Sequence, residues 1–313
     1  MTALTASRPT AQESPRKGPG PGSRKLRRRN TLVGWSFILP NFLGFGFCVL
    51  IPIISLFYIS LTEWNILGDP EFVGLANFTR LFQDHGFVKA FWNTMYYSVI
   101  HIPLTLALSL GLALLLNQKL RGLTFFRSAS FFPYFASIVA VAQVWNMLLS
   151  KDFGLVNQLL RLVGVDNPPG WTSSTAWAMP AVIIVGTWRE MGYYMVLFLA
   201  GLQTVPVELH EAAKVDGASA WSRFWNVTMP CLRPTTFFVT VMLTIGSFKI
   251  LDLIIVMTGG GPGDSTMVLS QYIYEKGFSE GEFGYASAIS LVLFFICLVV
   301  TLIQFQYNRR KEA

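Results

Sequence analysis

The stretch Tyr285-Ala-Ser-Ala-Ile-Ser-Leu-Val-Leu-Phe-Phe-Ile-Cys-Leu-Val-Val-Thr-Leu-Ile-Gln304 contains no charged residue. A helix that crosses the hydrocarbon core of a bilayer needs about 20 predominantly apolar residues, so this stretch is long enough. In lipid, an α-helix satisfies its own backbone hydrogen bonds, whereas an open sheet leaves its edges unpaired. The stretch therefore predicts a membrane-spanning helix.

Five more apolar runs of similar length precede this stretch. The sequence is 52% hydrophobic and only 13% charged, whereas a soluble domain usually carries about 25% charged residues. Together the six runs predict an all-α, polytopic membrane protein with six transmembrane helices. The five preceding runs are 35–61, 91–116, 131–149, 177–199 and 235–257.

Lysine and arginine residues gather in alternate connecting segments. They are frequent in residues 1–30, around 119–127, in 203–233 and after residue 307, and sparse in the other three connections. Segments rich in Lys and Arg stay on the cytoplasmic side of a membrane, so both termini are predicted to be cytoplasmic. An even number of spans places both termini on the same side of the membrane, and the six predicted spans agree with this location. The same distribution explains the net charge of +7 as a topology signal and argues against nucleic-acid binding.

Composition divides the chain into four parts. Residues 1–30 are rich in Pro, Gly, Ser and Arg, cannot bury enough apolar surface, and are predicted to be a disordered basic cytoplasmic tail. Residues 31–90 are assigned to the first transmembrane helix and an extracellular segment, 91–307 to the membrane core, and 308–313 to a cytoplasmic C-terminal tail. The first apolar run exceeds the roughly 7–15 residues of a signal-peptide core, so it is expected to be retained.

The segment 202–234, between the fourth and fifth predicted spans, carries helix signals of its own. Pro206 suits the first position of a short helix, and Gly217 suits its stop. Ser219 can cap a second helix that is expected to end at Pro230. This second helix is predicted to have an apolar face made by Trp221, Phe224 and Trp225. By periodicity alone, the segment fits either a connector that lies on lipid headgroups or a docking element for a partner.

The residue pattern in this segment favours the docking element. Glu211-Ala-Ala213, then Asp216-Gly-Ala218 and Met229-Pro230, resembles the EAA loop of ABC-importer permeases. Met229 is a conservative departure, because the family more often has Leu there. The resemblance implies that the segment docks onto an ATPase subunit. The coupling residues that it implies are Glu211, Ala212, Ala213, Asp216 and Gly217.

Three further stretches, 72–78, 192–203 and 248–262, resemble the carbohydrate-uptake branch of the same family. The resemblance covers most of residues 35–307 and implies a type I importer permease fold in the cell membrane, with 91–307 as its core. It further implies a second homologous permease, an ATPase dimer, an extracytoplasmic solute-binding protein and a carbohydrate substrate. The implied function is passage of a sugar or oligosaccharide into the cell, driven by ATP hydrolysis on the partner and coupled through the EAA loop.

The chain itself is not expected to be an enzyme or to bind a cofactor or metal. It lacks a G-x-x-x-x-G-K-[ST] motif, so ATP and Mg are expected on the partner ATPase. The glycine-rich run 259–263 lacks the lysine of such a motif and predicts a turn. The three histidines (His85, His101 and His210) are scattered along the sequence, and the three cysteines form no metal-binding spacing.

Two charged residues, Arg189 and Glu190, fall near the middle of the fourth predicted span. Charges at that depth are costly and normally face a cavity or a partner. Gly186, Glu190 and Tyr193 share one helical face, which predicts that this face lines a solute pathway.

The fifth predicted span contributes polar residues to the same hypothesis, namely Ser247, Lys249 and Asp252. Ser247 and Lys249 are predicted to line the pathway opposite the fourth span. The alternative is that Lys249 with Asp252, or Arg189 with Glu190, form pairs within the chain or across the subunit interface that only hold helices together. Arg189 and Asp252 fit this structural role better, and Glu190 fits the pathway better.

Three other functions compete with a sugar permease. The first is an ABC permease for another solute, such as glycerol phosphate, an amino acid or a peptide. The second is a secondary transporter, which the EAA pattern opposes because such a transporter needs no ATPase. The third is an intramembrane enzyme, which the lack of paired catalytic groups in the spans opposes. The identity of the solute and of the partner subunits stays open.

Overall fold

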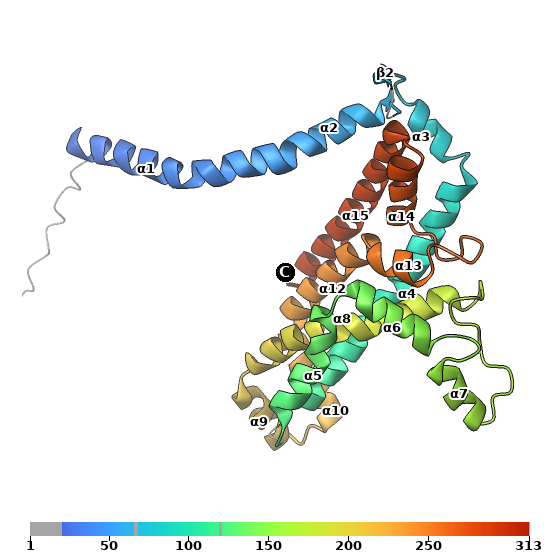
Figure 1. Ribbon diagram of the computed structural model, residues 1–313. Coiled ribbons are helices and arrows are strands. Elements are labelled where there is room, and N and C mark those ends of the chain that lie inside the picture. Colours follow the sequence, from blue (N-terminus) through green and yellow to red (C-terminus); the bar gives the residue numbers. More distant parts are fainter. Residues whose placement is uncertain (1–20, 66–67, 119–120, 313) are drawn as a thin grey trace, which may run out of the picture. The chain divides into compact units, whose positions relative to one another are not determined.

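The computed structural model describes residues 21–65, 68–118 and 121–312. Within these residues the protein is helical apart from one short antiparallel ribbon (Figure 1). The ribbon joins β1 (Thr62–Glu63) to β2 (Glu71–Phe72). The all-α fold class predicted from the sequence is confirmed.

The N-terminal part of the chain, up to Ser55, forms a unit of its own. It contains α1 (Pro21–Phe45), a π-helical segment η1 (Gly46–Leu50) and the start of α2 (Ile51–Ser60). The apolar helical stretch Val33–Ser60 is long enough to cross a membrane, in agreement with the first predicted span. Of the stretch predicted as a basic tail, residues 1–20 lie outside the described residues, and 21–30 belong to α1.

The second unit, Leu56–Ala313, is built around a pair of long helices, α4 (His85–Leu116) and α8 (Ala178–Gln203). These two helices make the most extensive contact in the fold. Half or more of the apolar stretch of α8 is buried. Because α8 is covered on several sides, its side chains are positioned by neighbours more than by lipid.

Two spans predicted as continuous helices are broken. α5 (Leu123–Phe135) and α6 (Ile138–Leu148) meet at 100°, so the predicted run 131–149 begins inside one helix and ends in another. The predicted run 235–257 likewise divides into α12 (Arg233–Phe248) and α13 (Asp252–Met257). In both places the backbone between the helices takes non-helical angles, at Ala136 and at Leu251.

The number of spans agrees with the prediction. Four helices in the described part of the chain are long and apolar enough to cross a membrane by themselves. Two bent pairs bring the number to six, the second pair being Ala220–Cys231 with α12 at 69°. The last span is α15 (Phe283–Glu312), which continues through most of the stretch predicted as a C-terminal tail.

Shorter elements connect these spans. They are α3 (Ala76–Leu81), α7 (Leu155–Leu162), α9 (Val207–Val215), α10 (Ala220–Arg223), η2 (Phe224–Thr228), α11 (Met229–Cys231), α14 (Leu269–Tyr274) and η3 (Glu275–Ser279).

Candidate functional site

A polar cavity of about 160 Å³ lies where α12 gives way to α13. The helix is interrupted at residues 249–251, and Ser270 of α14 donates a hydrogen bond to the freed carbonyl of Ile250. The interruption brings polar side chains of this span to the cavity, facing others from α4 and α8. The polar residues that line it are Tyr97, His101, Glu190, Ser247, Lys249 and Asp252.

The structure therefore brings together three of the five residues predicted to line a pathway: Glu190, Ser247 and Lys249. Glu190 comes from the middle of α8, and the other two come from the end of α12. Ser247 is buried and donates its hydroxyl to the carbonyl of Thr244. The cavity thus presents a carboxylate, an ammonium group and a hydroxyl oxygen to an occupant.

His101 is a site residue that the sequence reasoning missed. Its side chain is 1% exposed, and its Nε2 lies 3.8 Å from Glu190 Oε2. Tyr97 stacks on the imidazole, with 4.8 Å between ring centroids. Neither ring nitrogen makes a hydrogen bond of ordinary geometry within the described chain. The signal that was available is the i, i+4 spacing, which places Tyr97 and His101 on one face of α4.

Gly186 and Tyr193 lie outside the lining of this cavity. A Cβ atom at Gly186 would meet the Tyr97 hydroxyl at 2.8 Å, so the absence of a side chain at Gly186 leaves room for a tyrosine of this chain. Tyr193 instead stacks on Tyr134 of α5, with 4.4 Å between ring centroids and 14° between ring planes. In this conformation, the aromatic face expected to meet a sugar ring is covered. A place for either residue on the solute route stays a prediction.

Within the described residues, the charged neighbours of the cavity do not form the internal pairs that the structural alternative included. Arg189 donates to the carbonyl of Tyr134 at 3.3 Å, and its guanidinium lies 5.3 Å from the centroid of that ring. Among the described residues, no ion pair joins Arg189 to Glu190 or Lys249 to Asp252. Glu190 and Lys249 therefore line the cavity without an Arg189 or Asp252 partner among the described residues.

The segment that follows α8 forms an exposed elbow, which comprises α9, Gly217 and α10. Gly217 has φ 76°, and the next residue returns a backbone hydrogen bond to the carbonyl of Ala213 at 2.9 Å. Positive φ is costly for residues with a Cβ, so the predicted glycine stop is confirmed. The predicted cap is confirmed as well, because Ser219 Oγ accepts from the amide of Ser222 at 3.2 Å.

The five coupling residues all lie on this elbow. Glu211, Ala212, Asp216 and Gly217 are exposed and Ala213 is half-buried, and α9 contains no buried residue. Pro206 is the cap before α9 and not its first residue. Such a surface, which no other described residue covers, is open to a partner.

The second helix ends at Cys231, one residue after the predicted Pro230. Helical structure continues from α10 through η2 and α11, and the chain bends only at Leu232. The π-helical turn η2 shifts the hydrogen-bond register before Pro230, so its missing N–H is tolerated. The predicted aromatic face exists, since Trp221 and Phe224 both contact Trp225, with ring centroids 5.7 and 5.1 Å apart.

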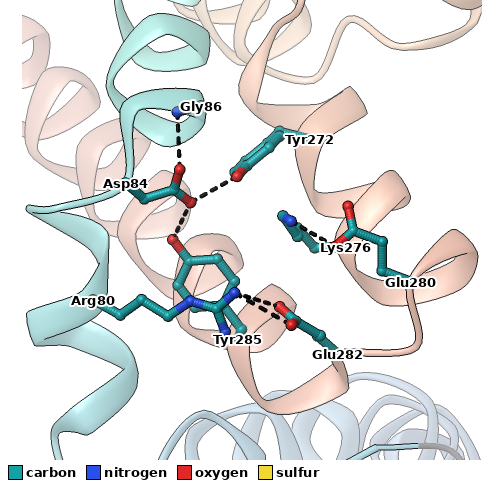
Figure 2. Close-up of polar contacts among 8 residues, drawn as sticks. All are labelled: Arg80, Asp84, Gly86, Tyr272, Lys276, Glu280, Glu282 and Tyr285. Atoms are coloured by element: carbon teal, nitrogen blue, oxygen red, sulfur yellow. Dashed lines mark hydrogen bonds and ion pairs between the residues drawn. The ribbon is translucent and has the colours of Figure 1, made fainter.

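A separate polar cluster surrounds the beginning of α4, and sequence reasoning did not find it (Figure 2). Asp84 caps α4 by accepting from the amide of Gly86 at 2.8 Å, and it also accepts from the hydroxyls of Tyr272 and Tyr285. Arg80 pairs with Glu282 at 2.9 Å and lies over the Tyr285 ring. The cluster ties α3 and α4 to α14 and α15. Burial opposes the charge on Asp84, but its hydrogen bonds together lower its pKa.

The glycine-rich run after α13 forms the predicted turn. Gly259, Gly260 and Gly263 all have positive φ. Thr258 and Thr266 close the turn through their hydroxyls, with 2.7 Å between the oxygens. Asn93 of α4 donates to backbone carbonyls in the turn, which fixes it against the bundle.

Residues 37–313 match the family described as binding-protein-dependent transport system inner membrane component. The chain is 32% identical to the trehalose/maltose transport system permease protein MalF of Thermococcus litoralis, covering 92% of this chain and 97% of that protein. It is 35% identical to the lactose transport system permease protein LacF of Rhizobium radiobacter, with the same two shares covered.

The fold is similar to a chain in a crystal structure of a bacterial alginate ABC transporter in complex with an alginate pentasaccharide-bound periplasmic protein. The TM-score is 0.80 at 26% identity, and the match covers 91% of this chain and 96% of that chain.

Proposed function

Because this chain belongs to the family of binding-protein-dependent transport system inner membrane components, we propose that it is a permease subunit of an ATP-driven importer for a sugar or oligosaccharide. The observation that carries the proposal is the exposed elbow at Gly217, joined by continuous structure to the polar cavity. The description of the family is that of a transport system, which supports passage of a solute as the role of this chain. The named relatives transport trehalose, maltose and lactose, which supports a carbohydrate as the substrate.

The chemistry of the cavity suits a hydroxyl-rich solute. Glu190 and Asp252 accept hydrogen bonds, and Lys249 donates them. Bonds that involve a charged partner are the stronger ones, so a few such groups can hold a sugar against water. The cavity in one chain is small, about 160 Å³. A second, homologous permease would supply the facing wall of a pathway wide enough for the solute.

Two helices connect the elbow to the cavity. α8 carries Glu190 and ends just before α9, and α12 starts after the bend at Leu232 and ends beside Lys249. Its 16 residues span about 24 Å at 1.5 Å per residue. An ATPase dimer that closes on ATP would displace the elbow, and rigid helices would carry that displacement to the cavity. Hydrolysis and reopening would reverse it, which gives alternating access.

The chain is a multi-pass membrane protein, and its orientation belongs to the proposal. Both termini and the elbow lie in the cytoplasm, where the partner ATPase holds ATP and Mg. The distribution of Lys and Arg supports this orientation. The opposite side, where the Asp84 cluster and the 258–268 turn lie, then faces an extracytoplasmic solute-binding protein. The complex described for the structural relative supports such a partner.

The test is to purify the intact complex from its host membrane and identify its components and bound solute by mass spectrometry. The expected result is a second permease, an ATPase and a carbohydrate, with uptake of that carbohydrate into proteoliposomes only when ATP is present. A transport-active complex without an ATPase would contradict the proposal. Recovery of glycerol phosphate, an amino acid or a peptide would support an ATP-driven importer but contradict a sugar as its substrate.

A further inference from the structure

A second cavity, of about 270 Å³, opens between the first turns of α12 and the last turns of α15. Its walls differ in character. One part is apolar and includes Met229 and Phe237, and Phe237 packs edge-on against Phe305 at 4.8 Å between centroids. The other part is polar and includes Arg233, Thr236 and Gln304. The cavity is therefore amphiphilic, and the solute site does not include it.

The polar wall contains groups that the described chain does not satisfy. Thr236 Oγ1 and Gln304 Oε1 are buried atoms with no hydrogen-bond partner among the described residues. The amide nitrogen of Gln304 is used by Thr244, to whose hydroxyl it donates at 2.8 Å. Arg233 is exposed and makes no ion pair or hydrogen bond within the described part of the chain. Buried polar atoms are normally hydrogen-bonded, so Thr236 Oγ1 and Gln304 Oε1 are available to bond with a molecule in the cavity.

The position of the cavity indicates what that occupant is. Arg233 stands at the first residue of α12, and the neighbouring span Phe283–Arg310 ends in Arg309 and Arg310. The cavity thus lies where apolar helices leave the hydrocarbon, at the level of lipid headgroups. Pockets with cations between transmembrane helices at that level bind anionic headgroups.

We propose that this cavity binds an anionic phospholipid whose headgroup carries a free hydroxyl, as phosphatidylglycerol does. The phosphate pairs with Arg233 and accepts a hydrogen bond from the Thr236 hydroxyl. The headgroup hydroxyl donates to Gln304 Oε1, which can only accept. The upper part of the acyl chains lies against Met229 and Phe237. A phosphatidic acid headgroup lacks the alcohol hydroxyl that donates to Gln304 here, and an ethanolamine headgroup would bring a cation close to Arg233.

The experiment uses the full chain within its purified complex, in nanodiscs that contain equal amounts of phosphatidylglycerol and phosphatidylethanolamine. Lipid that stays bound after transfer to detergent is measured by native mass spectrometry. The wild type is expected to retain phosphatidylglycerol in preference to phosphatidylethanolamine and to phosphatidic acid. Arg233→Gln and Thr236→Val should each reduce that retention about fivefold to tenfold, as expected for loss of one good hydrogen bond or ion pair. Thr236→Val keeps the side-chain shape and the charge, so it tests the site even if Arg233→Gln folds poorly.

The matched control is Arg309→Gln, which removes a cation from the same end of α15 without touching the cavity lining. Retention by this variant should equal that of the wild type. An equal loss of lipid retention in Arg309→Gln would show that general surface charge explains the effect, and it would overturn the proposal. Displacement of the lipid by glycerol 1-phosphate in solution would identify a free anion as the occupant. Absence of bound phosphatidylglycerol in the wild type would overturn the proposal.

Discussion

Glu190 of α8 and His101 of α4 face each other across the polar cavity, with 3.8 Å between carboxylate Oε2 and imidazole Nε2. The side chain of His101 is almost fully buried, whereas that of Glu190 is 27% exposed. The pair therefore has one member packed into the bundle and one member that can reach an occupant. The side chain of Glu190 therefore keeps part of its surface open to the cavity.

Replacement of Glu190 by Gln should reduce uptake of the solute. Loss of a charge-assisted hydrogen bond costs about 1.5–3 kcal/mol, or more than tenfold in binding. Basal ATP hydrolysis and the thermal stability of the complex should change little. The comparison variant is Arg189→Gln, because Arg189 holds the carbonyl of Tyr134 and does not line the cavity. That variant should lower stability before it lowers solute affinity. The reverse order would make Glu190 a structural residue.

Replacement of Gly217 by Pro should uncouple transport from ATP hydrolysis while the protein still inserts into the membrane. Proline fixes φ near about −65°, and Gly217 has φ 76°, so the elbow cannot keep its shape. Crosslinking from Ala213 to the ATPase should fall, and uptake should stop. Glu211→Lys should have the same effect through its charge on the exposed face. The control is Gly111→Ala, since a Cβ there meets nothing within 4 Å. Full uptake by both elbow variants would make the segment a passive connector.

Replacement of Gly192 by Ala should destabilise the contact between α5 and α8. A Cβ at Gly192 would lie 1.7 Å from the carbonyl oxygen of Ser130, so the helices must move apart. Overpacking of this kind costs about 1–3 kcal/mol. Thermal unfolding of the complex measures the loss, again with Gly111→Ala as the variant that should unfold like the wild type. An unchanged unfolding temperature for Gly192→Ala would show that α5 is not held against α8.

The Asp84 cluster should make stability depend on acid pH. The pKa of Asp84 is lower in the folded protein than the ordinary value, so its contribution is present above that ordinary value. It is lost as the pH falls from about 4 through the lowered pKa of the folded state. Asp84→Asn should therefore destabilise the protein at neutral pH and remove this part of the acid dependence. The measurement is the unfolding temperature of the wild type and of the variant, from about pH 6 down to about pH 3. Parallel curves for the two proteins would contradict the assignment.

Tyr272→Phe should reproduce part of that loss, because its hydroxyl donates to Asp84 at 2.6 Å. Removal of one such bond to a charged acceptor costs about 1.5–3 kcal/mol when the site is buried, and less here because the site is partly open. The control is Tyr274→Phe in the same helix, whose exposed side chain is not part of the cluster. Equal effects of the two changes would mean that the cluster adds nothing specific.

The sequence by itself determined the features that depend on short-range order. Apolar runs of sufficient length predict spans wherever they occur, because lipid requires internally bonded backbone. The elbow was predictable for a similar reason, since the glycine stop at Gly217 and the cap at Ser219 act within a few residues. Both features therefore appear in the structure near the expected positions.

Tertiary packing alone decided where those spans break and which residues meet. Ala136-Ser137 and Lys249-Ile-Leu251 contain neither glycine nor proline, so the strongest local signals for a break are absent at these positions. Tyr193 was expected in the pathway, but stacking on Tyr134 from another helix gives its ring a different neighbour. The Asp84 cluster joins residues separated by 188 and 201 positions in the chain. Local patterns carry no information about such partners, because the free energy that selects them arises only when distant helices come into contact.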